Sequence, residues 1–305
     1  MVNQNKNKHM ISIKKYAAID IGSNAMRLLV VNIVEQEGKD PQFNKSALVR
    51  VPIRLGQDAF TVGEISEENI SRMCDAMKAF NLLMKVHKVE AYRAFATSAM
   101  REAYNGKEVA ALIKKRADLK IEIIDGKKEA AIIASTDLMH LLEKDQNYLF
   151  VDVGGGSTEF TLFSNGKIVN SRSFKAGTVR LLNNMVCDVV WNEIEKWIKT
   201  NTEDFEDIAL IGSGGNINKL FKMSGKTQEK PLSYMYMNSQ YTFLDSLTYE
   251  QRISELGLNP DRADVIIPAI RIYLNAMKWS GARQIYVPKI GLSDGIVKAM
   301  YYGNI

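Results

Sequence analysis

The sequence contains few of the residue types on which several common kinds of site depend. Among 305 residues there are 2 cysteines and 3 histidines. Their spacing matches neither a zinc site nor a catalytic Cys–His or Ser–His–Asp arrangement. We therefore expect Cys74 and Cys187 to be buried reduced thiols, and His9, His87 and His140 to be solvated or packed.

Long apolar segments are missing as well. No stretch is apolar for long enough to cross a bilayer, and the polar residues 2–8 lack the apolar core of a signal peptide. We therefore expect a cytoplasmic protein without membrane association. The formal net charge is +5, which suits a polyanionic substrate but is equally typical of a solvated surface. Because no ladder of aromatic and basic residues accompanies this charge, nucleic-acid binding is not expected.

The most informative feature that is present is a glycine-rich turn within residues 150–160, Phe-Val-Asp-Val-Gly-Gly-Gly-Ser-Thr-Glu-Phe. An apolar strand there leads into an Asp, three glycines, a Ser, a Thr and a Glu. Glycines allow main-chain N–H groups to approach a phosphate, and the flanking carboxylates can hold Mg²⁺ or a water molecule. A glycine triplet after a strand is also compatible with a simple tight hairpin.

Two further segments follow the same pattern and favour the phosphate-binding interpretation. Near the start, an apolar strand ends in Asp20-Ile-Gly-Ser-Asn24, and later the strand 208–211 leads into Gly212-Ser-Gly-Gly215. The recurrence of this turn near the heads of both halves suggests an internal duplication around a shared cleft.

Strands alternate with helices along the chain, which predicts an α/β fold with helices covering the faces of its sheets. We expect a helix capped by Ser66, with Met73, Met77 and Met84 in its apolar stripe. Strands are expected at 16–34 (two, joined at Gly22), 48–53, 91–96, 121–124, 148–153, 159–163, 167–174, 208–211 and 284–287, and further helices at 107–116 and 127–142. The length is sufficient for two domains, each with its own core.

Taken together, the glycine turns resemble the two phosphate loops and the third glycine loop of the exopolyphosphatase/guanosine-pentaphosphatase (Ppx/GppA) family. Four further segments look like family blocks in family order, namely Arg54-Leu-Gly56, Ala96-Thr-Ser-Ala-Met-Arg-Glu-Ala103, Ile124-Asp-Gly126 with Glu129-Ala130, and Pro260-Asp-Arg-Ala-Asp264. The resemblance is to the short form of the family, and it implies two ribonuclease H-like domains of the actin/sugar-kinase superfold around a central cleft. We place the domains at residues 1–127 and 128–305, with packing of the last helix back on the first domain as an open alternative.

The resemblance also implies an activity, the Mg²⁺-dependent hydrolysis of the terminal phosphoanhydride of inorganic polyphosphate to release orthophosphate. Guanosine pentaphosphate (pppGpp) is the close alternative substrate, and a catalytically weak sensor of polyphosphate or nucleotide is a second alternative. A kinase of the same superfold would need an adenosine pocket and a phosphate acceptor, for which the sequence has no clear signature. A homodimer is an open possibility.

Matching to the family motifs makes Glu129 the general base that readies the attacking water, and Arg101 a forked clamp on phosphate. Arg27 and Arg54 are weaker candidates for the clamp. The residues expected to bind substrate phosphate are Gly22, Ser23, Asn24, Arg101, Gly154, Gly155, Gly156, Ser157, Gly214 and Gly215. Those expected to hold Mg²⁺ are Asp20, Asp152 and Glu159.

The chain departs from the family pattern at a few positions. Ala25 stands where the family commonly has a hydroxyl residue, Asn216 replaces a usual Thr, and residues 292–295, Leu-Ser-Asp-Gly, replace Leu-Arg-Glu-Gly. Lys128 replaces a frequent Glu, and its ammonium would lower the pKa of Glu129 if the two side chains approached each other. These departures leave the turnover rate and the choice of substrate open, although the acid set is complete.

Overall fold

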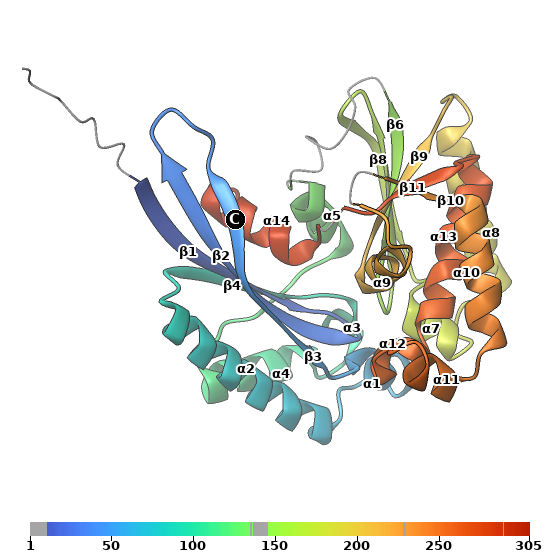
Figure 1. Cartoon of the computed structure of the whole chain (residues 1–305). Helices are drawn as coiled ribbons and strands as arrows, with labels where there is room; N and C mark the ends of the chain where they lie inside the picture. The colour runs from blue at the N-terminus through green and yellow to red at the C-terminus, as the bar shows by residue number, and fades with distance from the viewer. Residues whose placement is uncertain (1–10, 135, 137–145, 228–229, 289) are drawn as a thin grey trace, which may run out of the picture.

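Two mixed sheets, one in each half of the chain, form the frame of the protein (Figure 1). The computed structural model describes residues 11–134, 136, 146–227, 230–288 and 290–305. The predictions for His9, for His140 and for most of the far end of the helix at 127–142 lie outside these residues.

The first sheet has the strand order β3-β2-β1-β4-β5. Its strands β1 (Ile11–Ile21), β2 (Ala25–Gln36) and β3 (Gln42–Pro52) form an antiparallel meander, and β4 (Ala91–Ala96) and β5 (Glu122–Ile123) continue the sheet parallel to β1. The associated helices are α1 (Leu55–Thr61), α2 (Glu67–His87), α3 (Ser98–Glu102) and α4 (Gly106–Ala117). As predicted, Ser66 caps α2, since its hydroxyl accepts a hydrogen bond from the Asn69 N–H at 3.3 Å.

The second sheet repeats this topology and has the order β10-β11-β9-β6-β7-β8. Strands β6 (Asn147–Val153), β7 (Thr158–Ser164) and β8 (Lys167–Phe174) form the antiparallel meander. Next to β6, β9 (Ala209–Ser213) and β11 (Gln284–Tyr286) run parallel, with the short β10 (Leu232–Ser233) at the edge. Two copies of one meander-plus-parallel sheet confirm the predicted fold class, a pair of ribonuclease H-like domains of the actin/sugar-kinase superfold.

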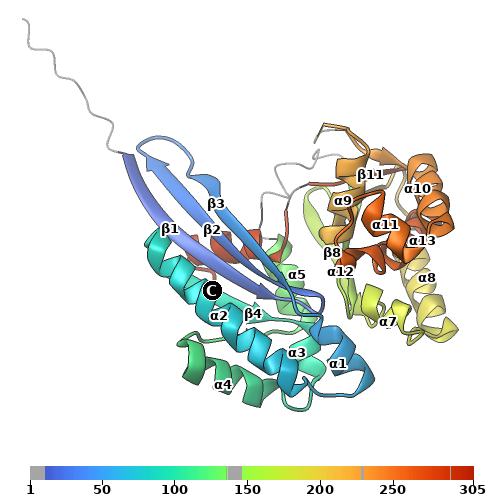
Figure 2. The same ribbon diagram turned by 60° about the horizontal axis from the view of Figure 1, so that its bottom comes forward.

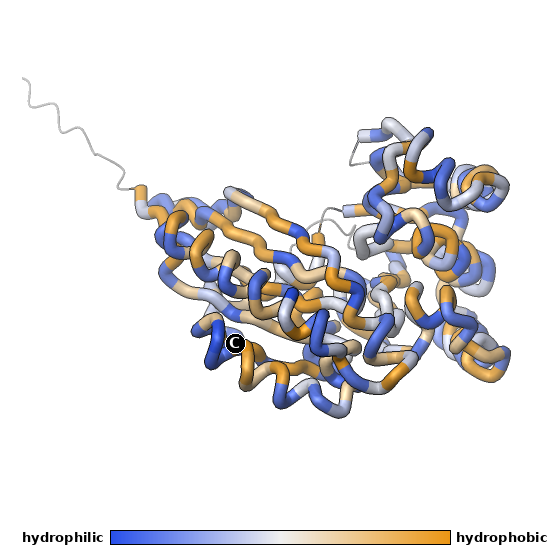
Figure 3. The backbone as a smooth tube through the Cα atoms, turned by 90° about the horizontal axis from the view of Figure 1, so that it is seen from below, coloured by the Kyte–Doolittle hydropathy of each residue, from blue (hydrophilic) through white to orange (hydrophobic). Residues whose placement is uncertain are grey.

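The remaining helices follow the first sheet along the chain. They are α5 (Gly126–Ala134), α7 (Thr178–Leu182), α8 (Asp188–Thr202), α9 (Gly215–Met223), α10 (Tyr234–Ser246), α11 (Tyr249–Ser254), α12 (Pro260–Ala263), α13 (Ile266–Ser280) and α14 (Leu292–Tyr301). Figure 1 shows α8, α10 and α13 side by side on the outer face of the second sheet. Hydrophobic and hydrophilic residues alternate along the backbone in strands and helices alike (Figure 3), as expected of elements that bury one face.

An apolar cluster that lies between the two sheets joins them. Along β1, Ala17, Ile19 and Ile21 face α2, whereas Ala18 faces the opposite, inner side of the sheet, as the two-residue period of a strand requires. The inner side packs on α14 and α5, which in turn contact the inner side of the second sheet in one continuous apolar cluster. The last helix therefore lies on the first sheet, between the two halves of the molecule.

The cysteines differ from the prediction in one respect. Cys74 is buried in α2, but Cys187 is exposed. The expectation for Cys187 was wrong because α8 begins one residue later and buries Ile194, Trp197 and Ile198, whereas the apolar residues around its start, including Val189, face solvent.

Candidate active site

The loop between β1 and β2 is a tight turn that the first domain braces from two sides. The Gly22 N–H donates to the Ala25 carbonyl at 3.1 Å, which closes the turn. The Gly56 N–H donates to the Ser23 carbonyl at 2.7 Å. On the other side, the Ser23 and Ser98 hydroxyls share a buried hydrogen bond of 2.9 Å. The first predicted phosphate loop is thus held in one fixed conformation.

The loop between β6 and β7 lies directly against this first loop. A Cβ atom built on Gly155 would lie 2.8 Å from Ser23 Cβ, and one built on Gly156 would lie 2.3 Å from Phe60 Cζ. Both distances are shorter than carbon atoms tolerate, so glycine at 155 lets the two loops touch and glycine at 156 lets the second loop lie against α1. Figure 2 shows the same junction from below, where α1 of the first half meets α7 of the second.

The third glycine turn lies against the end of β6, the strand that leads into the second loop. Gly214 has φ +119°, a conformation that L side chains rarely adopt, and its Cβ would lie 3.0 Å from the Val153 carbonyl and 3.6 Å from Asp152 Oδ1. The guanidinium groups of Arg27 and Arg262 approach the next residue, since their Nη2 atoms would lie 3.4 and 3.3 Å from a Cβ on Gly215. The three predicted loops therefore converge in the structure.

Four carboxylates gather where these loops meet. Asp20 is the last residue but one of β1 and accepts a hydrogen bond from Arg27 at 3.0 Å. Asp152 and Glu159 are opposite each other on β6 and β7, and Glu159 accepts hydrogen bonds from the Ser157 hydroxyl at 2.6 Å and from the Ser173 hydroxyl at 2.8 Å. Glu129 comes from the first turn of α5 and is 9 % exposed.

Burial raises the pKa of every one of these acids, and the charges of neighbouring acids raise the pKa values of Glu129 and Asp152 further. Burial and the neighbouring Glu159 raise the pKa of Asp152 from 3.8 to about 7. The pKa values of Asp20 and Glu159 are also raised by burial, against the opposing effects of Arg27 and of the Ser157 hydrogen bond respectively. The neighbouring cations and hydrogen bonds therefore do not fully compensate the negative charge that these acids carry when ionised.

Glu129 is the most perturbed member of the cluster. Burial raises its pKa well above the ordinary value, the charges of Glu159, Asp152 and Asp20 raise it further, and Arg101 opposes them. One of its oxygens, Oε2, is buried without a hydrogen-bond partner. The Lys128 ammonium pairs with Glu122 instead of approaching Glu129, so the interaction considered from the sequence does not occur.

The predicted clamp and the amide of the first loop have partners of their own. Arg101 Nη1 donates to the Ile124 carbonyl at 2.7 Å, and its charge acts on both Glu129 and Glu159. Asn24 Nδ2 donates to the Asp261 carbonyl at 2.9 Å, across the junction between the two halves. Arg101 therefore lies among the acids, whereas one amide hydrogen of Asn24 serves the contact between domains.

The donor set suits a hydrated magnesium ion better than a metal held by protein atoms alone. Within the described ranges, no group of three or more His, Cys, Asp or Glu side chains is arranged to hold a metal ion. Magnesium usually keeps several waters and uses one or two carboxylates together with substrate phosphates. A cluster of carboxylates with raised pKa values and the unpaired oxygen of Glu129 fit that mode of binding.

Arg262 is a site residue that the sequence analysis did not single out. It belongs to the Pro260–Asp264 segment, and its pKa is lowered by burial and by the charges of Arg50 and Arg27. In the part of the chain that the structure describes, it forms no ion pair. The family block Pro260–Asp264 was recognised in the sequence and contains this arginine, but nothing local indicated that its side chain lies at the third glycine loop.

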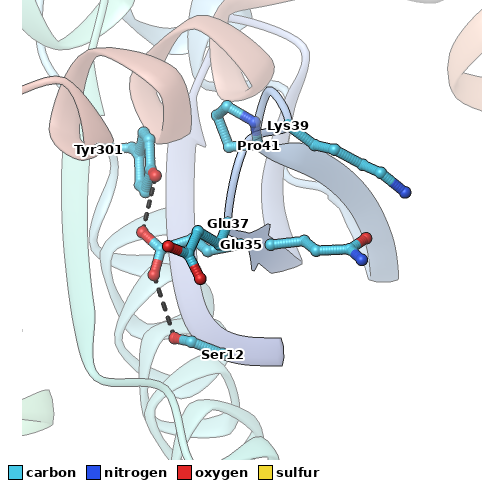
Figure 4. Close-up of a pocket in the computed structure, with 7 residues that line it drawn as sticks. Ser12, Glu35, Glu37, Lys39, Pro41 and Tyr301 are labelled. Carbon is cyan, nitrogen blue, oxygen red and sulfur yellow. Dashed lines mark hydrogen bonds between the residues drawn. The ribbon is translucent and has the colours of Figure 1, made fainter. Parts of the chain in front are cut away.

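A separate surface pocket lies at the far edge of the first sheet (Figure 4). Its acid, Glu35, accepts hydrogen bonds from Lys14 at 2.8 Å, Tyr301 at 2.7 Å and Ser12 at 3.0 Å. These partners, Lys14 first, lower the pKa of Glu35 to about 2. The bond from Tyr301 to Glu35 fastens the end of α14 to the sheet, at the end of β2 that is remote from the glycine loops.

Comparison with known proteins gives consistent matches. The sequence profile of the Ppx/GppA phosphatase family matches residues 35–302. Exopolyphosphatase 2 of Mycobacterium tuberculosis is 30% identical over 95% of this chain and 99% of its own length. A bifunctional 3-dehydroquinate synthase/phosphatase of Fusobacterium nucleatum is 29% identical over 94% of this chain, which spans 46% of that longer relative.

Two further similarities concern a second activity and the fold. A guanosine-5'-triphosphate,3'-diphosphate pyrophosphatase of Photobacterium profundum is 29% identical over 93% of this chain and 59% of its own length. Among solved structures, an exopolyphosphatase from Cytophaga hutchinsonii superimposes with a TM-score of 0.84 at 26% identity, covering 95% of this chain and 98% of the other.

Proposed function

Because this chain belongs to the Ppx/GppA phosphatase family, we propose that it is an exopolyphosphatase, which hydrolyses the terminal phosphoanhydride of inorganic polyphosphate and releases orthophosphate. The observation that carries the proposal is the convergence of three glycine loops on four buried carboxylates. Relatives that the chain matches over most of its length carry exopolyphosphatase names. The family resemblance seen in the motifs is confirmed by the match over residues 35–302.

The loops supply the binding of the terminal phosphate in this proposal. Backbone N–H groups of residues 23–24, 155–157 and 214–215 would hold its oxygens, as phosphates are bound at glycine turns. The N–H groups of Gly22 and Gly154 close these turns instead, by donating to the carbonyls of Ala25 and Ser157. Arg27 and Arg262 approach the third loop and would bind the phosphates that follow in the chain. Phosphoryl transfer gains most from such positioning and charge neutralisation, because its transition state needs little covalent assistance.

Glu129 is proposed to take the proton from the attacking water. Its buried Oε2 has no partner in the described structure and is therefore available to accept a hydrogen bond. The raised pKa brings the carboxylate toward the range in which a general base is effective. Arg101 opposes this rise, which helps to keep the acid ionised near neutral pH.

We propose that Asp20, Asp152 and Glu159 hold a hydrated Mg²⁺. When bound, the ion would supply positive charge to the phosphate oxygens and to the carboxylates around it. The protein's own contribution is the geometry, since Asp152 and Glu159 are fixed opposite each other and the two serine hydroxyls orient Glu159.

Guanosine pentaphosphate is the second candidate substrate. The relative from Photobacterium profundum is named for its action on a guanosine 5'-triphosphate 3'-diphosphate, and the same loops would accept its terminal phosphate. A sensor with weak catalysis is the remaining alternative. Within the described ranges, no helix combines the length and apolar character that a membrane span requires, and cytoplasmic localisation stays a prediction.

The test is phosphate release from long-chain polyphosphate and from pppGpp in the presence of Mg²⁺. Wild type should release phosphate from polyphosphate, and Glu129→Gln should not. Glu108→Gln is the matched control, because Glu108 is also an acid in the first turn of a helix, α4, but is exposed. Faster release from pppGpp than from polyphosphate would replace the first candidate by the second. Absence of release from both would favour a sensor.

A further inference from the structure

A row of charges crosses the inner face of the first sheet next to the acid cluster. In the strand register, Asp20 of β1 is opposite Arg27 of β2, and Arg27 is opposite Arg50 of β3. Directly opposed side chains have Cβ atoms about 5 Å apart, and like charges in such a pair are destabilising. The pairing of Arg27 with Arg50 therefore needs an explanation beyond the stability of the sheet.

The second domain places one anion and one cation at the end of this row. Asp261 of α12 forms an ion pair with Arg50, and the adjacent Arg262 approaches Arg27 at the third glycine loop. Arg50 and Arg27 both lower the pKa of Arg262. Three guanidinium groups thus share one small region, and Asp261 is the anion that the second domain places against them.

The hydrogen bonding at this contact between the two domains is incomplete in the described structure. Arg50 Nε and Asn24 Oδ1 are buried without partners. The Arg50 side chain itself is 20% exposed and that of Asp261 is 9% exposed. A buried guanidinium nitrogen that lacks an acceptor indicates that Asp261 alone does not satisfy Arg50.

The backbone of Asp261 is held separately from its side chain. Asn24 Nδ2 donates to the Asp261 carbonyl at 2.9 Å, and Asp264, at the other end of the segment, forms an ion pair with Arg54 at 2.6 Å. Rotation of the Asp261 side chain away from Arg50 would leave both of these contacts intact. The carboxylate can therefore leave Arg50 without separation of the two domains.

We propose that Asp261 is a displaceable anion that occupies Arg50 until a phosphate chain long enough to reach β3 replaces it. The inference rests on the proposed function, since it requires a chain of phosphates that extends outward from the acid cluster past Arg27. Phosphate is a better partner for a row of guanidinium groups than a single carboxylate, because it presents several oxygens to more than one of them. Asp261 is then a specificity-determining residue that weakens the binding of long chains, which have to displace it, and leaves the binding of short chains unaffected.

The experiment measures binding on a Glu129→Gln background, so that the ligand is not cleaved. The probes are long-chain inorganic polyphosphate and tripolyphosphate, whose few phosphates stay near the glycine loops. Asp261→Asn should lower the Kd for long-chain polyphosphate by about tenfold, the effect of freeing one charged hydrogen-bonding partner. The Kd for tripolyphosphate should remain unchanged.

Two further variants separate displacement from general loosening of the domain contact. Asp264→Asn breaks the neighbouring ion pair with Arg54, whose charge does not act on Arg262, and it should not tighten binding. Adding Arg50→Gln to Asp261→Asn should abolish the tenfold gain. Thermal unfolding of each variant establishes that it is folded.

The outcomes distinguish this inference from the function on which it rests. Polyphosphate binding and phosphate release by the protein with native Asp261, combined with no gain in Asp261→Asn, would overturn the displacement and leave the function intact. An equal gain in Asp264→Asn, or a gain that persists without Arg50, would overturn it as well. If long-chain polyphosphate binds to none of the variants, both the inference and the proposed function are wrong.

Discussion

Replacing Asp152 by Asn should stabilise the fold at alkaline pH while it removes activity. Folding raises the pKa of Asp152 from 3.8 to about 7 through burial and through Glu159. An acid with a raised pKa favours the folded state below its unfolded pKa, and that contribution is lost as the pH rises through the folded pKa. Above pH 7 the native Asp152 therefore opposes folding, and an uncharged amide of the same shape does not.

The magnitude follows from the size of the shift. A rise of about three pKa units corresponds to about 4 kcal/mol when the acid is fully ionised. This value is a ceiling, because the repulsion is shared with Glu159 and because Arg27 is left with one anion fewer. We expect Asp152→Asn to gain about 2 kcal/mol in the free energy of unfolding at pH 8, and much less at pH 5.

The assay is urea unfolding of both proteins at pH 5 and pH 8, without added divalent cations. Asp204→Asn is the control, because Asp204 is an exposed acid in the turn after α8, and it should change neither value. A gain of equal size at both pH values would refute the reasoning, since a packing effect does not titrate. A loss of stability at pH 8 would show that Asp152 is an ion-pair partner rather than a repelled acid.

Three other predictions concern the same site. Glu129→Gln should lower kcat for phosphate release by about 10²- to 10⁴-fold, the usual contribution of a positioned general base, and an unaffected rate would exclude that role. Gly155→Ala places a Cβ 2.8 Å from Ser23 Cβ, so kcat/KM should fall by roughly ten- to a hundredfold, whereas Gly291→Ala, whose Cβ meets nothing within 4 Å, should leave it unchanged. Magnesium should raise the Tm of the wild type more than that of Asp152→Asn, and equal shifts would argue against metal binding by this acid.

The local elements of the fold could be predicted because each has its cause within a few residues. The strand 91–96 was expected and is found as β4 with those bounds, and the helix expected at 107–116 spans Gly106–Ala117. The glycine turns were recognisable because an apolar strand ends in an acid just before them. The internal duplication followed from their repetition, and the two matching strand orders bear it out.

The contacts between distant segments could not be predicted in the same way. Nothing in the local sequence links Arg50 with Asp261, which is 211 residues away, or aims Arg262 at the third loop. The ion-pair partner of Lys128 could not be predicted either, since its pairing with Glu122 depends on where β5 ends relative to α5. Such pairs are set by how the two domains meet, and neither periodicity nor turn chemistry carries that information.

The site has an acidic half and a basic half, and in each half side chains of like charge lie close together. The predictions above follow from this arrangement. Burial raises the pKa values of all four acids, and neighbouring acids raise those of Glu129 and Asp152 further, while Arg27, Arg50 and Arg262 crowd together a short distance away. Two ion pairs link opposite charges here, Asp20 with Arg27 and Asp261 with Arg50, but among the described residues Glu129, Asp152 and Glu159 form none. A complex of a divalent metal with a polyphosphate, the ligand proposed above, would complement both halves at once, because the cation would meet the acids and the phosphates would meet the arginines.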